Sequence, residues 1–333
     1  MKVIVPMAGM GKRMRPHTLT VPKPLLPVAG KPIVHWLIED IARVCRDRIE
    51  EVAFVIGDFG AETEQKLLEV AESIGAKGKI FYQDEPLGTA HAVLCAEECL
   101  DGEVIVAFAD TLFRADFELD KTRDGIIWVH RVEDPRMFGV VKIDEGNNIT
   151  DFVEKPAEYV SDLAIIGIYY FRDGANLKSE LRYLLDNDIR EKGEYQLTNA
   201  LENMKNKGLR FAPGAVEEWW DCGNKDATVF TNQRLLATRP EQFSVDKSSY
   251  NGGTEIIEPC FIGANVRIKE SRIGPYVSIG DNTELENCVV DNSIIQSHSS
   301  IRNLKCTNSI IGNHVRLDGN SHELSIGDYS TQN

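Results

Sequence analysis

The sequence predicts an α/β domain with a mostly parallel sheet, followed by a parallel β-helix. In the first half of the chain, short apolar strands alternate with helical patterns, an order typical of parallel strands with helices on both faces of the sheet. Strands then dominate between residues 125 and 171. From about residue 245 the helical periodicity stops, and short apolar residues recur roughly every six residues, which is typical of stacked β-helix turns. We therefore expect one domain over residues 1–240 and a second over 245–333.

Each element of the first domain follows from the spacing of its apolar residues. Apolar runs predict buried strands over residues 2–7, 51–56, 79–83 and 103–108. Helical spacing between these runs predicts helices over residues 32–46, 62–74 and 88–99. Further strands are expected over 126–131, 139–143, 150–153 and 164–171, and further helices over 175–185, 196–205 and 226–237. In such sheets ligands bind beyond the carboxyl ends of the strands, where both the loop at residues 9–13 and Asp110 fall.

The second domain carries a repeat in which an apolar residue is followed by glycine. It is seen at Ile262-Gly263, Ile273-Gly274, Ile279-Gly280, Ile311-Gly312 and Ile326-Gly327. Such repeats stack so that each turn buries its apolar residues on the next. A small β-sandwich is the alternative architecture, and residues 293–309 depart from the repeat. We expect this domain to serve oligomerisation.

Composition and charge narrow the possible partners. The net charge of −15 opposes binding to nucleic acids and anionic membranes. No stretch approaches the roughly 20 apolar residues that a membrane span needs. The seven cysteines show no CxxC spacing, and the first residues form a short strand rather than the long apolar segment of a signal peptide. We expect reduced thiols and a cytoplasmic location.

The first 38 residues depart from this acidic composition, because they contain six basic residues and no Asp or Glu. Two glycines, Gly9 and Gly11, follow the first strand and would let backbone N–H groups approach a phosphate. The dinucleotide fingerprint fails at Met14, and the P-loop pattern fails at Arg13. Five prolines between residues 16 and 32 stiffen the segment that follows. The segment therefore predicts a rigid site for a small polyanion such as a nucleoside triphosphate.

These residues resemble the sugar nucleotidyltransferases, also called NDP-sugar pyrophosphorylases. The family signature AGxGTRxxPxT, KPxLP and KP is matched from Ala8 to Thr18, from Lys23 to Pro27 and at Lys31-Pro32, with Lys12 where Thr or Ser is usual. Six further segments resemble family motifs in the same order. They are residues 83–92 (QDEPLGTAHA), 109–111 (ADT), 136–141 (RMFGVV), 153–156 (VEKP), 164–169 (AIIGIY) and 220–223 (WDCG).

The resemblance implies a fold, a reaction and a set of site residues. The fold is a Rossmann-like mixed sheet flanked by helices, the nucleotide-diphospho-sugar transferase fold, with a C-terminal left-handed parallel β-helix. The reaction converts a nucleoside triphosphate and a sugar-1-phosphate into an NDP-sugar and pyrophosphate, with Mg²⁺ held by Asp110 and Asp221. The implied catalytic residues are Arg13, Lys23 and Asp110. The implied nucleotide contacts are Ala8, Gly9, Met10, Gly11, Lys12, Arg13, Gln83 and Gly88, and the implied sugar-phosphate contacts are Gly139, Glu154, Lys155 and Gly167.

The substrates stay open at this point. We favour dTTP and glucose-1-phosphate, with uridylyl transfer to glucose-1-phosphate or N-acetylglucosamine-1-phosphate and guanylyl transfer to mannose-1-phosphate as alternatives. A bifunctional enzyme with an acetyltransferase in the β-helix would need a catalytic histidine, for which His298, His314 and His322 are available. A non-catalytic subunit is the remaining alternative. The expected partners are the two substrates and further copies of the chain.

Overall fold

The computed structural model of the 333-residue chain describes residues 1–9, 11–45, 48–116, 119–246, 250, 253–319 and 322–332. The chain divides into two compact units. One comprises Met1–Gly9 and Leu37–Trp219, and the other comprises Met10–Trp36 and Trp220–Asn333. The basic loop after the first strand is thus grouped with the C-terminal part of the chain. The two domains expected over residues 1–240 and 245–333 stay a prediction.

The first unit is built around a mixed sheet of nine strands. Its four parallel strands lie in the order β6 (Val104–Ala107), β1 (Lys2–Pro6), β4 (Glu51–Ile56) and β5 (Lys77–Tyr82). Beyond β6 the sheet continues through antiparallel pairs formed by β11 (Leu163–Phe171), β9 (Gly139–Ile143), β10 (Ile149–Glu154) and β8 (Gly125–Arg131). The last strand, β12 (Phe211–Ala215), pairs in parallel with β8. This is the Rossmann-like mixed sheet that the sequence predicts.

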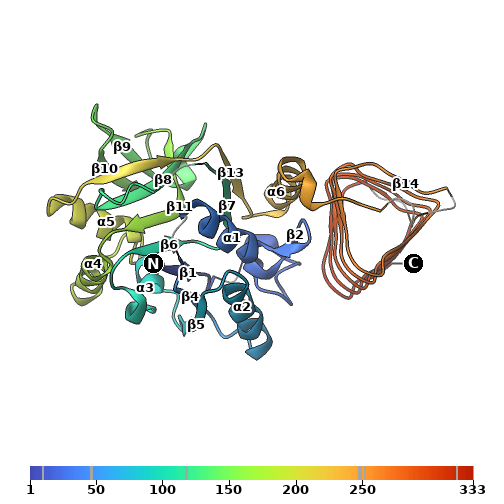
Figure 1. The fold of residues 1–333 in the computed structure, drawn as a ribbon, viewed down its shortest axis with the longest axis horizontal. Helices are drawn as coiled ribbons and strands as arrows, with labels where there is room; N and C mark the ends of the chain where they lie inside the picture. The colour runs from blue at the N-terminus through green and yellow to red at the C-terminus, as the bar shows by residue number, and fades with distance from the viewer. Residues whose placement is uncertain are drawn as a thin grey trace. The chain divides into compact units, whose positions relative to one another are not determined.

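Helices cover both faces of this sheet (Figure 1). One face carries α2 (Ala61–Ser73) and most of α1 (Ile33–Cys45), and the other carries α3 (Thr89–Leu94), α4 (Gly174–Asp186) and α5 (Leu197–Asn206). The chain runs from β1 to β4 to β5 in one direction and then returns past β1 to reach β6. Because crossovers between parallel strands are right-handed, this reversal puts α3 on the face opposite α1 and α2.

The core of the first unit follows from strands that are apolar on both faces. All residues of β6, and all of β1 after Lys2, are buried, as expected for central parallel strands covered by helices on each side. The cluster on the α3 face also takes in Leu177 and Leu181 of α4 and Leu201 of α5. This packing fixes the strand ends that carry the candidate site.

Some elements differ from the sequence-based expectation. The helix expected over residues 88–99 ends at Leu94, and a 3₁₀ turn at Glu97–Cys99 follows it. Strand β12 was not predicted because Pro213 and Gly214 normally interrupt strands. Among the described residues β12 pairs only with β8, and an edge position tolerates the absence of the N–H that proline lacks. Strands β7 (Thr111–Arg114) and β13 (Glu218–Asp221), which pair with each other, were also missed.

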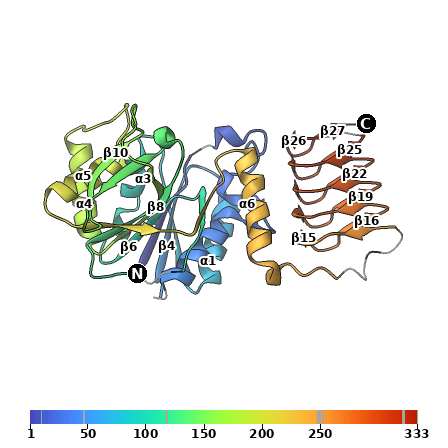
Figure 2. The ribbon, with the colours of Figure 1, turned by 90° about the horizontal axis from the view of Figure 1, so that it is seen from above.

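The second unit contains the expected left-handed parallel β-helix. Three parallel sheets form its sides, and the chain visits each sheet once per coil (Figures 1 and 2). One sheet contains β14 (Glu255–Ile256), β17 (Arg272–Ile273), β20 (Val289–Val290) and β23 (Lys305–Cys306). The second contains β15 (Cys260–Ile262), β18 (Val277–Ile279), β21 (Ile294–Ile295), β24 (Ile310–Ile311) and β26 (Ser325–Ile326). The third contains β16 (Arg267–Lys269), β19 (Glu284–Glu286), β22 (Ser300–Arg302), β25 (Arg316–Asp318) and β27 (Thr331–Gln332).

Successive coils of the β-helix become shorter along the chain. Partners on neighbouring coils are 17 residues apart at Arg267 and Glu284, 16 apart at Asn287 and Asn303, and 15 apart at Asn303 and Asp318. Three hexapeptides would give 18 residues. The missing residues are lost at the corners, so the apolar residues still align in the interior. This explains why the repeat looks irregular over residues 293–309.

Two further elements complete the second unit. Helix α6 (Lys225–Thr238) runs alongside the β-helix, as Figure 2 shows. The strands β2 (Pro27–Val28) and β3 (Lys31–Pro32) form a short antiparallel hairpin, which leads into the first turn of α1. A helix long and apolar enough to cross a membrane is not found among the described residues.

Candidate active site

The switch point of the sheet lies between β1 and β6, because the chain winds away from β1 in opposite directions on its two sides. Ligands of open α/β sheets bind at the carboxyl ends of the two strands that flank such a point. Ala8 and Gly9 follow the end of β1, and Asp110 follows the end of β6. A Cβ atom added to Gly9 would meet no atom within 4 Å. The backbone at Gly9 is therefore open to a ligand.

Gly167 lies beside the end of β6, which carries Asp110. The backbone N–H of Phe108 donates to the carbonyl oxygen of Gly167 at 2.9 Å. Thr111 Oγ1 donates to the carbonyl oxygen of Ile166 at 2.6 Å. Gly167 interrupts the regular pairing of β11 and has a φ of 87°, a conformation that glycine adopts without strain. The predicted metal ligand Asp110 and the predicted sugar contact Gly167 are thus neighbours in one unit.

Gly139 and Glu154 face each other across the antiparallel pair of β9 and β10. The Glu154 carboxylate lies above Gly139, because a Cβ atom there would be 3.1 Å from Glu154 Oε2. Lys155 follows Glu154 with a φ of 43°, an unusual conformation for a residue with a side chain. Its Nζ lies 3.6 Å from Glu154 Oε1, and its side chain is 48% exposed whereas that of Glu154 is 11% exposed. A sheltered carboxylate beside an accessible ammonium suits hydroxyl groups next to a phosphate.

The segment from Gln83 to His91 is held by its own hydrogen bonds. Gln83 Nε2 donates to the carbonyl oxygen of Gly88 at 3.2 Å and lies 3.0 Å from His91 Nδ1. Burial lowers the pKa of His91 against the opposing effect of Glu85, so the imidazole is neutral near pH 7 and Nδ1 accepts the bond. Gly88 has a φ of 119°, and a Cβ atom there would lie 2.4 Å from the carbonyl oxygen of Tyr195. Packing alone therefore requires glycine at position 88.

Residues 194–198 connect the Gln83 segment to Glu154, a role that the sequence did not reveal. The backbones of Ala90 and Tyr195 are hydrogen-bonded, and Leu197 N–H donates to Thr89 Oγ1 at 2.9 Å. At the start of α5, Thr198 Oγ1 donates to Glu154 Oε2 at 3.3 Å. No residue in this segment belongs to a motif used above, and its role depends on contacts across more than 40 positions of sequence. Only the packing of α5 on the sheet shows the connection.

The basic loop belongs to the second unit, where buried side chains anchor it. A 3₁₀ turn at Lys12–Met14 is closed by a hydrogen bond, in which the Met14 N–H donates to the carbonyl oxygen of Gly11 at 2.9 Å. Met14 is buried, and its sulfur lies 3.5 Å from Thr228 Oγ1 of α6. Lys12 and Arg13 on the same turn are both exposed. The loop therefore presents its charges to solvent from a fixed turn.

Lys23 lies beside Gly11, although twelve residues separate them in the chain. A Cβ atom on Gly11 would be 3.0 Å from the Lys23 Cβ and 3.1 Å from Thr18 Cγ2. Thr18 Oγ1 donates to the carbonyl oxygen of Gly11 at 2.9 Å. The structure thus brings together Gly11 and Lys23, two of the predicted phosphate contacts. Met10 lies outside the described residues.

Asp221, at the end of β13, also belongs to the second unit. Its Oδ1 accepts the Gly223 N–H at 3.0 Å, and its carbonyl oxygen accepts from Thr231 Oγ1 at 2.9 Å. A Cβ atom on Gly223 would lie 2.9 Å from Asp221 Oδ2. Glycine at 223 therefore leaves room for the carboxylate. Across the described parts of the chain, no group of three or more His, Cys, Asp or Glu side chains is arranged to hold a metal ion.

Comparison with known proteins identifies the family. A family model described as nucleotidyl transferase matches residues 2–238. The chain belongs to the nucleotidyl transferase family. It is similar to the low-salt glycan biosynthesis nucleotidyltransferase Agl11 of Haloferax volcanii, with 30% identity over 95% of this chain and 94% of the relative. It is also similar to a glucose-1-phosphate thymidylyltransferase of Streptomyces antibioticus, with 29% identity over 99% and 98% of the two chains.

Two further proteins are similar to this nucleotidyl transferase. The bifunctional protein GlmU of Methanocaldococcus jannaschii is 30% identical over 96% of this chain and 80% of its own length. The crystal structure of a UDP-glucose pyrophosphorylase complexed with UDP-glucose superposes with a TM-score of 0.59 and 23% identity, covering 72% of this chain and 99% of the other. The second likeness shows the fold alone. The family membership and fold expected from the sequence are confirmed, and the individual site residues stay predictions.

Proposed function

We propose that this nucleotidyl transferase joins a nucleoside triphosphate to a sugar-1-phosphate, with dTTP and glucose-1-phosphate as the favoured substrates. The observation that carries the proposal is the set of residues at the switch point of the sheet. Gly9 offers an open backbone there, Asp110 follows the adjacent strand end, and Gly167 is hydrogen-bonded to that same end. Ligand binding at this edge is the general rule for such sheets.

The chemistry needs positioning and charge neutralisation more than a strong base. The nucleophile is a phosphate oxygen of the sugar-1-phosphate, which is already an anion. It attacks the α-phosphorus in line, forms a new P–O bond and expels pyrophosphate. Two polyanions must therefore approach each other, and most of the barrier is reduced by orientation and cationic groups. An accessible cationic turn on a chain with a net charge of −15 supplies such groups.

We assign the basic loop to the triphosphate. Arg13 neutralises the triphosphate and the departing pyrophosphate, and Lys23 contacts the phosphates near the α-phosphorus. Ala8, Gly9, Met10, Gly11 and Lys12 provide the surrounding backbone and charge. The contact between Gly11 and Lys23 supports this assignment, since it keeps a backbone N–H group and an ammonium on one short segment.

We assign Gly139, Glu154, Lys155 and Gly167 to the sugar phosphate. Lys155 binds the phosphate, and Glu154 accepts hydrogen bonds from sugar hydroxyls. Glu154 is suited to this role because Thr198 already holds one of its oxygens. The ammonium of Lys155 lies 3.6 Å from its other oxygen, Oε1.

The hydrogen bonds of Gln83 favour a nucleotide whose base is a pyrimidine with an N3–H group. Its Nε2 is used inside the protein, by the Gly88 carbonyl oxygen and His91, so Oε1 is the atom turned to a ligand. A carbonyl oxygen accepts from the N3–H of thymine or uracil, whereas cytosine has an acceptor at N3. Gln83 and the Gly88 backbone are therefore assigned to the base, and the proposal favours dTTP, then UTP, over CTP.

Asp110 and Asp221 are proposed to hold Mg²⁺. Two carboxylates completed by phosphate oxygens and water match the ligands this ion prefers, because Mg²⁺ usually keeps several waters and takes one or two protein carboxylates. Glycine at position 223 supports the assignment, because a Cβ atom there would lie only 2.9 Å from Asp221 Oδ2. When bound, the ion would neutralise phosphate charge.

The metal assignment predicts that Asp110→Asn and Asp221→Asn each lower turnover by roughly 100-fold or more, because the amide cannot supply the anionic ligand. Circular dichroism and thermal melting should match those of the unchanged protein. Asp116→Asn, which replaces an exposed carboxylate outside the proposed site, serves as the control. Near-normal turnover in either active-site variant would contradict the assignment.

The decisive experiment mixes the protein with Mg²⁺, one nucleoside triphosphate and one sugar-1-phosphate at a time, and measures pyrophosphate release. We expect the largest kcat/KM with dTTP and glucose-1-phosphate. Glucose-1-phosphate thymidylyltransferases of Streptomyces antibioticus and Streptomyces griseus, similar over 99% of this chain, support that choice. Release with no pair of substrates in the panel would refute the function.

Uridylyl transfer to N-acetylglucosamine-1-phosphate, with or without acetyl transfer, is the second candidate. The likeness to the bifunctional protein GlmU favours it. However, two of the histidines available for acetyl transfer are part of a column of stacked rings. His298 and His314 stack with ring centroids 4.9 Å apart, and Tyr329 continues the column at 4.8 Å. The same substrate panel, repeated with acetyl-CoA and glucosamine-1-phosphate, separates the two candidates.

We propose further that the protein works in the cytoplasm as a homo-oligomer. Within the described residues the seven cysteines form no disulfide, and six of them are buried, which fits a reducing compartment. Light scattering coupled to size exclusion should give a mass that is a multiple of the mass of one chain. A monomer at micromolar concentration would contradict this proposal.

A further inference from the structure

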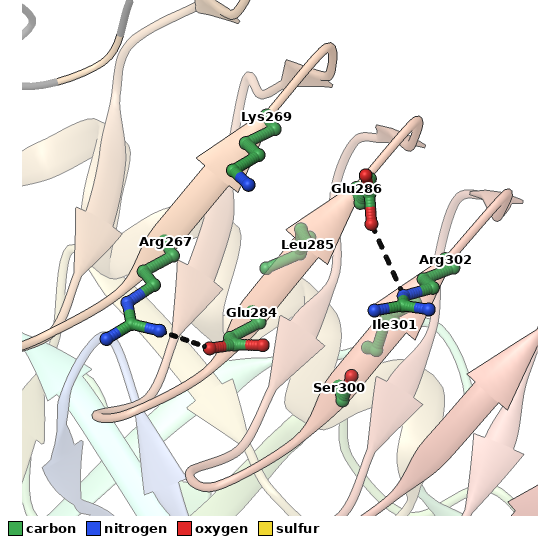
Figure 3. A pocket seen from close by; sticks show the side chains of 8 residues that line it. All are labelled: Arg267, Lys269, Glu284, Leu285, Glu286, Ser300, Ile301 and Arg302. Atoms are coloured by element: carbon green, nitrogen blue, oxygen red, sulfur yellow. Dashed lines mark hydrogen bonds and ion pairs between the residues drawn. The ribbon is translucent and has the colours of Figure 1, made fainter.

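The three sides of the β-helix differ in the residues that they turn outward. The side formed by β16, β19 and β22 carries ion pairs, with Arg267 Nη1 2.9 Å from Glu284 Oε1 and Arg302 Nε 3.3 Å from Glu286 Oε2 (Figure 3). These are exposed side chains typical of a solvated surface. The side formed by β15, β18, β21 and β24 is different. Its outward positions hold Phe261, Ser278, Ile294 and Ile310.

This second side is covered within its own unit. Ile294 and Ile310 are only 3% and 2% exposed, although the next residue along each strand belongs to the interior of the β-helix. The Phe261 ring lies so close to the β2–β3 hairpin that a Cβ atom on Gly30 would be 2.4 Å from it. The centroid of the same ring lies 6.5 Å from that of the Phe243 ring, and the Phe243 centroid lies 6.2 Å from that of Trp36. The apolar side therefore packs against the segment that follows the basic loop.

Asn232 of α6 joins the hairpin to the β-helix. Its Oδ1 accepts the Ala29 N–H at 2.9 Å and the Ser278 Oγ hydroxyl at 2.6 Å. Its Nδ2 donates to the carbonyl oxygen of Tyr276 at 3.3 Å. Asn232 is fully buried, and Ala29 and Ser278 are nearly so. A buried amide on α6 with partners on two other segments, the hairpin and one coil of the β-helix, fixes their relative positions, because each lost bond leaves a buried polar group unpaired.

A second set of contacts holds the chain between Gly11 and Lys23. His17 Nε2 lies 3.1 Å from Ser325 Oγ, and Thr20 Oγ1 donates to Asp328 Oδ2 at 2.6 Å. Ser325 and Asp328 belong to the last described coil of the β-helix. The chain from Gly11 to Ala29 is thus attached in two places, between Gly11 and Lys23 and again after Lys23.

We propose that Asn232 is a positioning residue, through which the β-helix holds the basic loop in its triphosphate-binding conformation. The β-helix then contributes to nucleotide binding within a single chain, in addition to any role in oligomerisation. The physical reason is preorganisation, since a loop that is already ordered loses less conformational entropy when it binds its ligand. This inference rests on the proposed assignment of the loop to the nucleoside triphosphate.

The test compares Asn232→Ala and Ser278→Ala with Ser293→Ala in the full-length protein. Ser293 is also a buried serine of the β-helix, but its Oγ donates to the carbonyl oxygen of Asp291 and accepts the N–H of Ser309 on the next coil. We expect KM for dTTP to rise about tenfold in Asn232→Ala and about threefold in Ser278→Ala, from the loss of one to three buried hydrogen bonds. KM for glucose-1-phosphate and kcat should stay within about twofold, and Ser293→Ala should leave the KM for dTTP unchanged, since its bonds do not reach the loop.

Hydrogen exchange measured by mass spectrometry provides a second readout that does not depend on activity. Peptides from residues 11–25 should exchange faster in Asn232→Ala and Ser278→Ala than in Ser293→Ala. Ser278→Ala keeps the test valid if Asn232→Ala does not fold. An unchanged KM for dTTP in an active Ser278→Ala protein, or equal exchange of residues 11–25 in all variants, would overturn the inference. An unchanged protein that uses no substrate pair, but whose variants show the faster exchange, would instead refute the proposed function.

Discussion

Lys23 and Lys155 make the two proposed anion contacts, and the backbone supports them differently. Lys23 begins a 3₁₀ turn whose next two residues, Pro24 and Leu25, are buried. Lys155 follows the end of β10 with a φ of 43°, and its N–H donates to the carbonyl oxygen of Phe138 at 3.1 Å. A side-chain-bearing residue in this region costs energy that the surrounding structure has to supply. Such a cost is common where a side chain must point into a binding site.

The two lysines are expected to affect different kinetic parameters. Lys23→Ala should lower kcat by about 100-fold, since the proposed contact strengthens as charge develops near the α-phosphorus. Lys155→Ala should mainly raise KM for the sugar phosphate, by about tenfold or more, because it removes a charge-assisted hydrogen bond made before the reaction. Steady-state kinetics with each substrate varied in turn measures both. The opposite pattern would exchange the two roles.

At the scale of the element, the basic loop depends on one close approach. Gly11 has a left-handed backbone with a φ of 56°, and a Cβ atom added there would lie only 3.0 Å from the Lys23 Cβ, which leaves no room for a larger residue. Gly9, two residues earlier, has open space instead. The two glycines of the loop therefore have different physical reasons, close packing at Gly11 and open space beside the backbone at Gly9.

The two glycines should respond differently to alanine. Gly11→Ala should lower the free energy of unfolding by about 1–3 kcal/mol, since it adds backbone strain and a steric overlap. Gly9→Ala should leave the melting temperature unchanged and raise KM for the nucleoside triphosphate, because the added methyl group occupies the space assigned to a phosphate. Thermal melting and substrate kinetics on both variants separate these effects. Equal melting temperatures for the two variants would refute the packing explanation for Gly11.

At the scale of the whole molecule, stability should depend on pH through His17. This imidazole is 2% exposed and its Nδ1 has no hydrogen-bond partner within the described residues. Burial lowers the pKa of His17 from 6.5 to about 4, against the opposing charge of Asp328. Between these two values the unfolded chain binds a proton that the folded chain does not. The contribution of the neutral His17 to the free energy of unfolding is therefore fully present above pH 6.5. It is lost as the pH falls toward 4, by roughly 3 kcal/mol at most.

Removing the imidazole should reduce this dependence. His17→Gln should show a smaller drop in melting temperature between about pH 7 and about pH 4.5 than the unchanged protein, because glutamine does not titrate. His322→Gln, which changes an exposed histidine, is the control and should keep the original slope. Differential scanning calorimetry in buffers of matched ionic strength measures the slopes. Parallel curves for His17→Gln and the unchanged protein would contradict the assignment of a neutral, buried His17.

The sequence alone determined the fold class, the family and the list of candidate residues. It could do so because buried parallel strands, helical periodicity and a repeat of about six residues are local patterns, and because the family motifs are short segments. It also determined that the loop is cationic on an acidic chain. Among the strands it missed, β12 and β13 lack a periodic apolar pattern.

Only the tertiary structure decided how these residues are supported. It brought Lys23 against Gly11, linked Thr198 to Glu154, explained Gly88 by the Tyr195 backbone, and joined Ala29 to Ser278 through Asn232. Each of these contacts joins residues far apart in the chain. Their energies depend on burial and distance, which no local pattern encodes. The sequence therefore determined which groups are present, and the packing decided which of them act together.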